Sequence, residues 1–426
     1  MLRPTAADHR VIGVYTGKIV TGFALLMVLP LVTSVVFAEW ATAVDFGIGL
    51  AACLIVGLGL QQVCTTTQEL KRRHGLVVVS LSWALATALG AIPFILSGHM
   101  SGLLDSVFDV MSGLTTTGLY LIQDLDHVSN GLNMWRFVLT FTGGQGIVVI
   151  ALTFLFKGSG GGIYHLYSGE GKEDRLVPNV VQTARVIWLV SLAWLAVGTT
   201  ALTAAALALG QPPVRAALHG LWIFMGAFST GGFAPQSFNT FWYHSLVFEV
   251  LCIIIFVVGS LNFAVHWRVW TGERSELRRN IETRSFVVTL GVFVLLCAVG
   301  LARSGIYPDA LPFVRKCLYL VMSGHTTTGF GTVYSRSLVT QWGPVAMLAI
   351  IGSMIIGGSS CSTAGGIKGI RVSLITRALA EDTRRLLGPD TAVISSRYHH
   401  IKDRILNETS VRSALLVTVM FMVLHS

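Results

Sequence analysis

Long apolar runs, separated by short polar connections, dominate the chain. A helix that crosses a membrane needs about 20 mostly apolar residues. Runs that approach this length cover residues 22–37, 45–63, 75–96, 134–156, 186–209, 245–266, 285–302 and 344–356, the last continuing to 375. A final apolar run, 413–424, is too short to span comfortably and runs into the end of the chain. The pattern predicts an all-α integral membrane protein whose last span is incomplete.

Composition supports a membrane protein and excludes most soluble classes. Of the 426 residues, 53% are hydrophobic and only 12% are charged, whereas a typical soluble domain has about 25% charged residues. The net charge of +9 does not indicate nucleic-acid binding, because the basic residues lie in clusters between apolar runs. The six cysteines stand singly, without CxxC spacing, which predicts free buried thiols rather than zinc ligands or disulfides.

Lysine and arginine residues set the predicted orientation, because they are enriched in cytoplasmic loops. With the N-terminus in the cytoplasm, 24 of the 30 basic residues fall on the cytoplasmic side, in the N-terminal segment and at 71–73, 157–185, 268–284 and 368–412. The first apolar run is predicted to be a span rather than a signal peptide, because no cleavage site follows it and a second span comes directly after it.

Three connections on the opposite side repeat one phrase. It reads MSGLTTTG at 111–118, MGAFSTGGF at 225–233 and MSGHTTTGF at 322–330. Aligned on the last glycine before position 119, 233 or 330, each copy has a methionine seven residues upstream and a Ser or Thr three residues upstream. The copies are 114 and 97 residues apart, which indicates an internal repeat.

Each phrase follows a half-length apolar segment, at 103–111, 216–228 or 311–322. Non-helical backbone at membrane depth is tolerated only where its carbonyl groups face protein, water or an ion. A Thr–Gly stretch in extended form can point successive carbonyls the same way, and rings of carbonyls replace the hydration shell of an alkali cation. The preceding half-helix turns the negative end of its dipole inward, which favours cations. The unit therefore predicts a cation pathway, whereas ordinary loop composition would explain one copy but not three.

A second interruption of helical sequence is the segment GGSSCSTAGG at 357–366, with four glycines and four hydroxyl residues. It predicts a break in the middle of the span that begins at 344, below the third loop. We interpret it as a movable plug lining the pathway; the alternative is close helix packing by small residues. For the cluster GGQG at 143–146, tight packing is the better explanation.

These residues resemble the Trk/Ktr/HKT superfamily of potassium transporters, from about residue 72 to the end. The resemblance implies four fused repeats around a pseudo-fourfold pore, and the two additional N-terminal spans resemble the Trk-type branch. It implies filter carbonyls at Thr116, Thr117, Gly118, Thr230, Gly231, Gly232, Thr327, Thr328 and Gly329. It implies an intramembrane gating loop of Gly357, Gly358, Ser359, Ser360, Cys361, Ser362, Thr363, Ala364, Gly365 and Gly366, followed by Lys368. Serine at the first filter glycine accompanies sodium selectivity in the plant relatives, so Gly118 favours potassium.

The resemblance also implies a homodimer in the inner cell membrane that contacts lipid and a cytosolic RCK-type nucleotide-binding ring. It implies K⁺ as the transported ion, no cofactor and no nucleic-acid partner. The expected segments are 1–70 with two spans, pore repeats at 71–160, 161–270 and 271–378, and 379–426 with the start of a fourth repeat. The loop and closing span of that repeat are missing, so we expect either a truncated chain or an incomplete natural product.

Several polar residues leave alternatives open. Asp105 and Asp109 in the first half-helix either concentrate cations at the entrance or pair with nearby basic residues. Glu249 lies within a span, where a charge suggests a function, yet pairing with Arg215 would also explain it. The glycine-rich segment 158–162 is predicted to be a linker rather than a phosphate loop. The histidines, among them His325, His399 and His400, show no zinc-binding spacing.

Three function classes compete. The first is a potassium-selective transport subunit, working either as a channel or as a proton- or sodium-coupled symporter. The second is a secondary transporter of another cation such as sodium, or of a small solute, that uses broken helices; Glu249 is its best candidate charge. The third is a membrane enzyme, which is disfavoured because the sequence has no paired carboxylates, metal cluster or nucleophile–base spacing.

Overall fold

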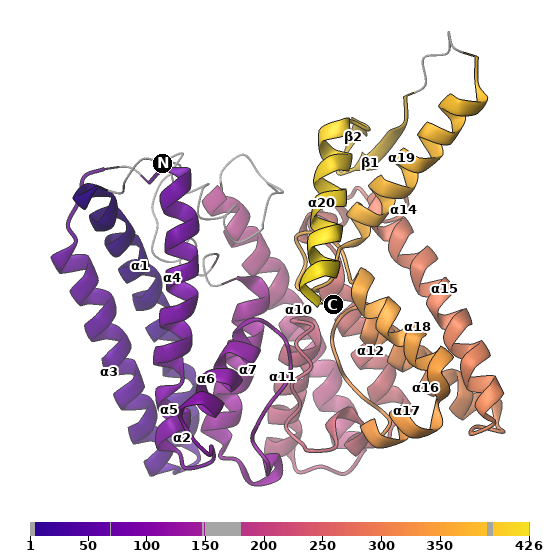
Figure 1. Ribbon diagram of the computed structural model, residues 1–426. Helices are drawn as coiled ribbons and strands as arrows, with labels where there is room; N and C mark the ends of the chain where they lie inside the picture. Colours follow the sequence, from indigo (N-terminus) through magenta and orange to yellow (C-terminus); the bar gives the residue numbers. More distant parts are fainter. Residues whose placement is uncertain (1–4, 69, 147–148, 150–179, 390–394, 426) are drawn as a thin grey trace. The chain divides into compact units, whose positions relative to one another are not determined.

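The computed structural model describes residues 5–68, 70–146, 149, 180–389 and 395–425. It is built mostly of helices and divides into two compact units, Met1–Cys252 and Ile253–Ser426. The first unit contains the 3-10 helices η1 (Leu125–His127) and η2 (Asn239–Tyr243) and the helices α1 (Ala6–Leu26), α2 (Val28–Val36), α3 (Trp40–Val63), α4 (Arg72–Gly90), α5 (Ile92–Leu96), α6 (Leu103–Leu114), α7 (Asn130–Gln145), α10 (Val180–Ala208) and α11 (Pro213–Phe228) (Figure 1). Helix α12 (Leu246–Ser260) begins in this unit.

Close helix packing and a buried aromatic cluster hold the first unit together. A Cβ atom on Gly17 of α1 would lie 2.7 Å from the carbonyl oxygen of Gly57 in α3, so the two backbones meet without intervening side chains. Trp135 of α7 lies with its ring centroid 5.5 Å from that of Phe23 and 6.1 Å from that of Phe46. Small residues at helix contacts are typical of membrane proteins, because lipid tails are as apolar as the side chains they compete with.

The second unit is built around three helices. Its elements are α13 (Phe263–Trp270), α14 (Glu276–Arg279), α15 (Ile281–Ser304), α16 (Ala310–His325), α17 (Ser335–Gln341), α18 (Gly343–Ile356), α19 (Gly369–Leu387), β1 (Arg397–His400), β2 (Lys402–Ile405) and α20 (Glu408–His425) (Figure 1). Cys297 and Leu301 of α15, Val321 of α16, and Trp342 and Ala346 at the start of α18 form its buried core.

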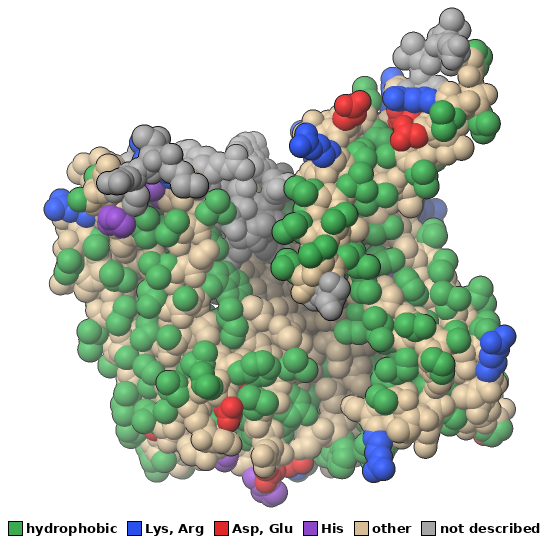
Figure 2. Space-filling model, in the orientation of Figure 1, with side chains coloured by type: hydrophobic (Ala, Val, Ile, Leu, Met, Phe, Trp, Pro, Cys, Tyr) green, Lys and Arg blue, Asp and Glu red, His purple; other side chains and the backbone are tan. Residues whose placement is uncertain are grey.

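Several helices have the length and hydropathy of membrane spans. Among the described residues these are Ala6–Val36, Trp40–Val63, Arg73–Leu96, Val181–Ala208 and Ile281–Ser304, with a sixth if the bent pair α12 and α13 is one span. Figure 2 shows hydrophobic side chains over the visible face of α1, α3 and α4, with basic side chains near the end where the chain begins. The predicted half-length segments are confirmed as α6, α11 and α16, and the predicted break after residue 356 separates α18 from α19.

Several predicted span boundaries are wrong; the helix in the run 134–156, for example, ends at Gln145. The first span starts at Ala6 rather than at residue 22, because Thr5 and Asp8 form a capping box and Arg73 pairs with Asp8 at 2.8 Å, which satisfies the charge near the helix start. The run 245–266 is not one helix: α12 and α13 meet at an angle of 100°. Asn262 causes this break, because its side chain caps α13 by accepting a hydrogen bond from the backbone N–H of Ala264.

A two-stranded antiparallel hairpin, β1 with β2, departs from the all-α expectation. Arg397 pairs with Ile405 at its open end and His400 with Lys402 at its turn. The hairpin is anchored on α19, where Arg377 donates to the Arg397 carbonyl at 3.0 Å and Glu381 accepts from the Ser396 N–H at 3.0 Å. The segment that enters β1 is therefore fixed to α19.

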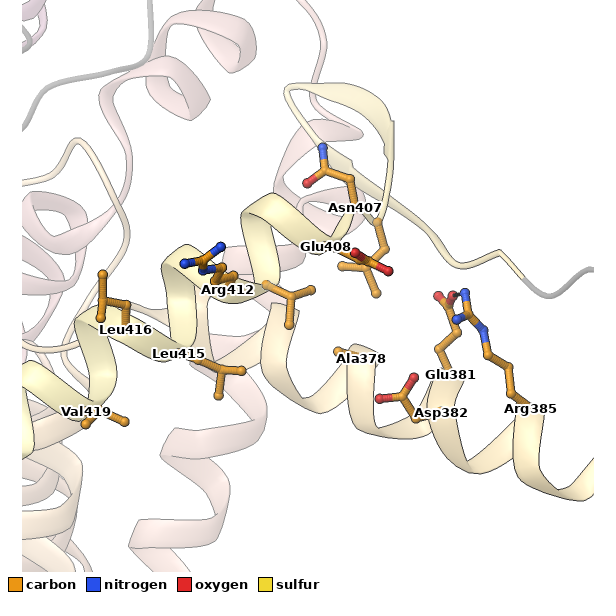
Figure 3. A pocket seen from close by; sticks show the side chains of 12 residues that line it. Ala378, Glu381, Asp382, Arg385, Asn407, Glu408, Arg412, Leu415, Leu416 and Val419 are labelled. Carbon is orange, nitrogen blue, oxygen red and sulfur yellow. Dashed lines mark hydrogen bonds and ion pairs between the residues drawn. The ribbon is translucent and has the colours of Figure 1, made fainter.

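Helices α19 and α20 border a groove of about 590 Å³. Figure 3 shows Glu381 beside Arg385 on α19, joined at 2.5 Å, and Leu415 and Val419 on α20. Charged side chains line the groove from α19 (Glu381, Asp382, Arg385) and from the first turns of α20 (Glu408, Arg412), and Leu415, Leu416 and Val419 follow along α20. The groove therefore separates a polar anchoring region from an apolar helix face.

We predict that docking of the hairpin depends on pH through His399. Burial lowers the pKa of His399, but hydrogen bonds to Glu276 of α14 at 2.9 Å and to Asp403 of β2 at 2.7 Å outweigh burial and raise the pKa above 6.5. A raised folded-state pKa adds stability that is present at low pH and is lost as the pH rises through that pKa. Hydrogen–deuterium exchange at the Ile401 N–H, which donates to Glu276, should therefore lose protection between pH 6 and 9 after correction for intrinsic rates.

Two carboxylates, Glu276 and Asp403, limit the stability of the hairpin contact at low pH. Burial raises the pKa of Glu276, but hydrogen bonds from His399 and Asn280 lower it overall, and the hydrogen bond to His399 lowers the pKa of Asp403, which also faces Arg279 at 3.9 Å. Their contribution is present at neutral pH and is lost on strong acidification. His399→Gln should show a flat profile over pH 6–9; an equally steep loss of protection in that variant would contradict the assignment to His399.

Candidate functional site

The three half-helices end in the same way. In each, the N–H of the capping residue donates to the carbonyl of the phrase's methionine: Thr115 to Met111 at 2.8 Å, Ser229 to Met225 at 3.1 Å and Thr326 to Met322 at 3.0 Å. The next two N–H groups also turn back to the last helical turn. The repeat found in the sequence is therefore a repeat of backbone geometry as well.

The same two positions of each loop have left-handed backbone. The φ angles are +54°, +52° and +58° at Thr116, Thr230 and Thr327, and +78°, +69° and +82° at Gly118, Gly232 and Gly329. The Thr/Gly stretches were predicted to be extended, but left-handed backbone interrupts each of them at two positions. Left-handed backbone costs a non-glycine residue about 1–2 kcal/mol, and its recurrence at three matched threonines indicates a functional constraint.

In all three loops the amide groups face the preceding helices, and in the first and third loops one carbonyl group is left open. The middle residue of each loop donates its N–H to the preceding helix: Thr117 to Ser112 at 2.8 Å, Gly231 to Gly226 at 3.0 Å and Thr328 to Ser323 at 2.9 Å. Within the described part of the chain, no hydrogen bond is donated to the carbonyl oxygens of Thr117 and Thr328. Open carbonyls at membrane depth need water or a cation as a partner.

Loops one and two touch each other within the first unit. A Cβ atom on Gly118 would collide with the carbonyl oxygen of Gly231, and one on Gly231 would collide with the hydroxyl of Thr140 in α7. The hydroxyls of Thr140 and Ser229 are 3.1 Å apart. The glycines are therefore required by contact as well as by backbone conformation.

Two buried residues of opposite charge, Arg136 and Asp109, lie next to these two loops. The Arg136 guanidinium is 4.5 Å from the ring centroid of Phe233 and 5.5 Å from that of Tyr120, the residues that follow the two loops. Asp109 is its electrostatic partner and accepts the Leu121 N–H at 2.7 Å. Arg136 and Asp109 are each 1% exposed. Arg136 donates hydrogen bonds to the Asn133 side chain and the Ala234 carbonyl at 3.2 and 3.4 Å, and among the described residues no ion pair joins it to Asp109; both roles considered for Asp109 stay predictions.

In the second unit, the segment 357–368 forms a closed loop between α18 and α19. The N–H groups of Ile367 and Lys368 donate to the carbonyls of Ile355 and Ile356 at 2.9 and 2.8 Å. These bonds join the two ends of the loop. The Lys368 ammonium donates to the carbonyl of Ala364, inside the same loop.

Several further hydrogen bonds attach this loop to its surroundings, among them bonds from Ser359 to the Ser260 carbonyl and from the Asn262 amide to the Ser360 hydroxyl. The Gly365 N–H donates to the hydroxyl of Thr327 in the third Thr/Gly loop at 2.7 Å. The Thr363 hydroxyl donates to the Gly259 carbonyl at the end of α12 at 2.8 Å. The Ser360 N–H donates to the carboxylate of Glu282 in α15 at 2.7 Å. The break predicted from the glycines is therefore an ordered loop bonded directly to the third Thr/Gly loop.

A family comparison identifies the class of protein. The family described as TrkH, cation transport protein, matches residues 43–425. The chain belongs to the TrkH family. Membership confirms the resemblance stated from the sequence, and the family is one of transporters rather than enzymes. The TrkH assignment covers all three Thr/Gly loops and the loop 357–368.

Individual relatives agree with this assignment. An uncharacterized cation transporter of Methanocaldococcus jannaschii is 28% identical over 405 residues, which cover 95% of this chain and 79% of the relative. The Trk system potassium uptake protein TrkH of Salmonella typhimurium is 27% identical over 386 residues, covering 88% of this chain and 76% of the relative. The crystal structure of the potassium transporter TrkH from Vibrio parahaemolyticus has a TM-score of 0.78, with 23% identity, over 98% of this chain and 82% of that chain. The last comparison establishes a shared membrane-transporter fold.

The remaining candidate residues of this TrkH-family protein contact other side chains or are buried. His325 is buried, with its ring 2.7 Å from the hydroxyl of Thr289. Glu249 is buried, while Arg215 lies over the ring of Trp242 at 5.4 Å, so their pairing stays a prediction. The described residues include no cluster of His, Cys, Asp and Glu fit to hold a metal ion. The linker at 158–162 lies outside the described residues.

Sequence reasoning missed two important side chains. Arg136 was counted only among basic residues on the outer side, although a charge inside the apolar run 134–156 marks a candidate functional position. Glu282 gave no such signal, because it stands beside polar residues at the start of a span. The cluster at 143–146 does pack tightly: a Cβ atom on Gly144 would lie 3.0 Å from that of Ser229.

Proposed function

We propose that the protein carries potassium ions across the inner cell membrane through its Thr/Gly loops. The observation that supports this most directly is the matched loop geometry, in which amide groups turn back onto the half-helices and left-handed backbone recurs at the same two positions of each loop. The filter would consist of the carbonyls of Thr116, Thr117, Gly118, Thr230, Gly231, Gly232, Thr327, Thr328 and Gly329. Carbonyl oxygens are hard, uncharged ligands suited to an alkali cation.

We further propose that the loop 357–368 is the gate. Its hydrogen bond to Thr327 would let any movement of the loop reach the third filter position. The small side chains of the loop and its closure by backbone hydrogen bonds favour movement as one segment. In the proposed topology the N-terminus is cytoplasmic, and the chain has two N-terminal spans (1–70), pore repeats at 71–160, 161–270 and 271–378, and a final segment, 379–426.

The proposed assembly is a homodimer with a cytosolic RCK-type nucleotide-binding ring. The clustering of basic residues at 268–284 and 368–412 supports a cytoplasmic surface that an acidic partner face would recognise. Lipid would contact the exposed apolar faces of the spans, such as that of α3, where Ile55 is 73% exposed.

Rubidium uptake into proteoliposomes tests the transport proposal. The unaltered protein should accumulate ⁸⁶Rb⁺, and excess K⁺ should compete better than Na⁺. Gly329→Val should lower uptake by at least about tenfold, because a β-branched residue in left-handed backbone (φ +82°) adds both strain and bulk beside the open carbonyls. Gly305→Ala, which has left-handed backbone at the end of α15 and open space around it, is the control and should transport normally.

The outcomes separate the candidate functions. Preferential competition by Na⁺ would replace the potassium assignment with that of a sodium transporter. Unchanged uptake by Gly329→Val would contradict the filter assignment, and no uptake by the unaltered, folded protein would contradict ion transport by these loops.

A further inference from the structure

Glu282 holds the gating loop, defined as residues 357–368, from the side of α15. Its side chain is in the first turn of that helix and the residue is 1% exposed. One carboxylate oxygen accepts the Ser360 N–H at 2.7 Å, and the other is 3.4 Å from the amide nitrogen of Asn262 at the break between α12 and α13. A buried carboxylate is stable only when such donors surround it, so the loop and the carboxylate fix each other.

The same carboxylate also faces the β1–β2 hairpin. His400, on β1 and 1% exposed, places its ring nitrogen 3.8 Å from the second oxygen of Glu282. The neighbouring His399 donates its Nε2–H to Glu276 of α14 at 2.9 Å, and Glu276 also accepts the Ile401 N–H. Two carboxylates at the α14–α15 junction therefore hold the end of the hairpin.

Asn280 joins these two carboxylates. Its amide group donates to Glu276 at 2.8 Å, and its side-chain oxygen accepts the N–H of Glu282 at 2.9 Å, capping α15. A continuous chain of polar contacts thus runs from the hairpin through the start of α15 to Ser360. In contrast with this buried chain, all four residues of β2 are exposed, so this strand is the part of the hairpin accessible to solvent.

We infer that Glu282 is a positioning residue that couples the hairpin to the gating loop, so that displacing the hairpin loosens the loop at Ser360. This inference rests on the proposed function only in treating the loop 357–368 as a gate. The coupling itself rests on the contacts of Glu282 with His400 and Ser360. The physical basis is that a buried carboxylate losing one favourable partner reorients toward those that remain, and Ser360 is bonded to the same group.

Cys361 offers a direct readout that does not depend on transport. It is half-buried and adjacent to Ser360, whereas Cys53, Cys252, Cys297 and Cys317 are buried. Cys64 is also half-buried, so the experiment uses a Cys64→Ser background. The rate at which a maleimide modifies Cys361, followed by mass spectrometry of the whole protein in detergent, then measures how freely the loop moves.

We expect His400→Ala to accelerate Cys361 modification about two- to fivefold, as expected for loss of an electrostatic contact at 3.8 Å that is not a hydrogen bond, although the substitution lies in the hairpin. Glu282→Gln should have a similar effect, and the double variant should be no faster than the faster single variant, because both act on one contact. Lys402→Gln, on exposed β2, is the matched control and should label at the background rate. His400→Gln replaces the alanine variant if the latter does not fold.

Labelling of Cys297 and Cys317 in the same samples separates local loosening from general unfolding. These thiols lie in the core of the second unit and should stay protected in every variant. An unchanged Cys361 rate in His400→Ala, with acceleration only in Glu282→Gln, would overturn the coupling, as would acceleration of all three cysteines together. Rubidium uptake measured on the same preparations tests the proposed function separately. If the Cys64→Ser background protein does not take up rubidium, the proposed function fails, but the labelling rates still test the coupling.

Discussion

Replacing Gly118 with alanine is expected to lower rubidium uptake by more than about tenfold. We expect no other glycine-to-alanine substitution in the filter loops to have a larger effect. Gly118 has a φ of +78°, and its Cβ atom would collide with the carbonyl oxygen of Gly231. The left-handed backbone alone costs about 1–2 kcal/mol. The collision adds a displacement of the second loop, so one substitution alters two filter positions. Uptake into proteoliposomes at matched protein content measures the effect.

Two glycines serve as graded controls for Gly118→Ala. Gly329 has a φ of +82° but no heavy atom within 4 Å of an added Cβ, so Gly329→Ala introduces backbone strain without a collision. Gly210, at the end of α10, has the same φ of +82° and equally open surroundings, away from the loops. We expect Gly210→Ala to take up the most rubidium, Gly329→Ala less, and Gly118→Ala the least. Equal uptake by the Gly118 and Gly210 variants would show that contact between the loops does not matter.

The parts of the site that the sequence revealed are those encoded locally. Half-helices α6, α11 and α16 were predictable because each apolar segment is short and ends in hydroxyl residues and glycine. The break after Ile356 was predictable because consecutive glycine and serine residues cannot continue a lipid-facing helix. These features depend on the residues at the site itself, so no knowledge of distant contacts was needed.

The missed features depend on contacts between distant segments. Threonine disfavours left-handed backbone, so local propensity argues against the conformation of Thr116; the bonds from the loop to its own half-helix impose it. The bend after Ser260 lies in an apolar run whose hydropathy is continuous, and Asn262 is the one local sign. The hairpin has no distinctive alternation of apolar residues, and the carboxylate of Glu276 from another segment holds its turn.

Substitution of Arg136 with methionine is expected to cause the largest loss of stability, about 3–5 kcal/mol, the range found when a buried charge loses the opposite charge near it, because it also removes the hydrogen bonds donated to Asn133 and Ala234. The variant leaves Asp109 buried, with the Leu121 N–H as a partner but without its opposing charge. It also removes the cation that lies between Tyr120 and Phe233, the residues that follow the first two loops. The thermal unfolding midpoint of the detergent-solubilised protein should fall markedly.

A double-mutant cycle distinguishes the charge pair from simple packing. Asp109→Asn combined with Arg136→Met removes both charges, so most of the lost stability should return. Selective transport should not return with it, because the ring contacts of the guanidinium at 4.5 and 5.5 Å position the two loops relative to each other. Arg136→Lys retains a charge but not the planar group that stacks on both rings, and should fold while discriminating less between Rb⁺ and Na⁺. Additive losses of stability in the double variant would mean that the two side chains act independently. Normal discrimination between Rb⁺ and Na⁺ in both Arg136 variants would mean that Arg136 and Asp109 contribute to folding and not to selectivity.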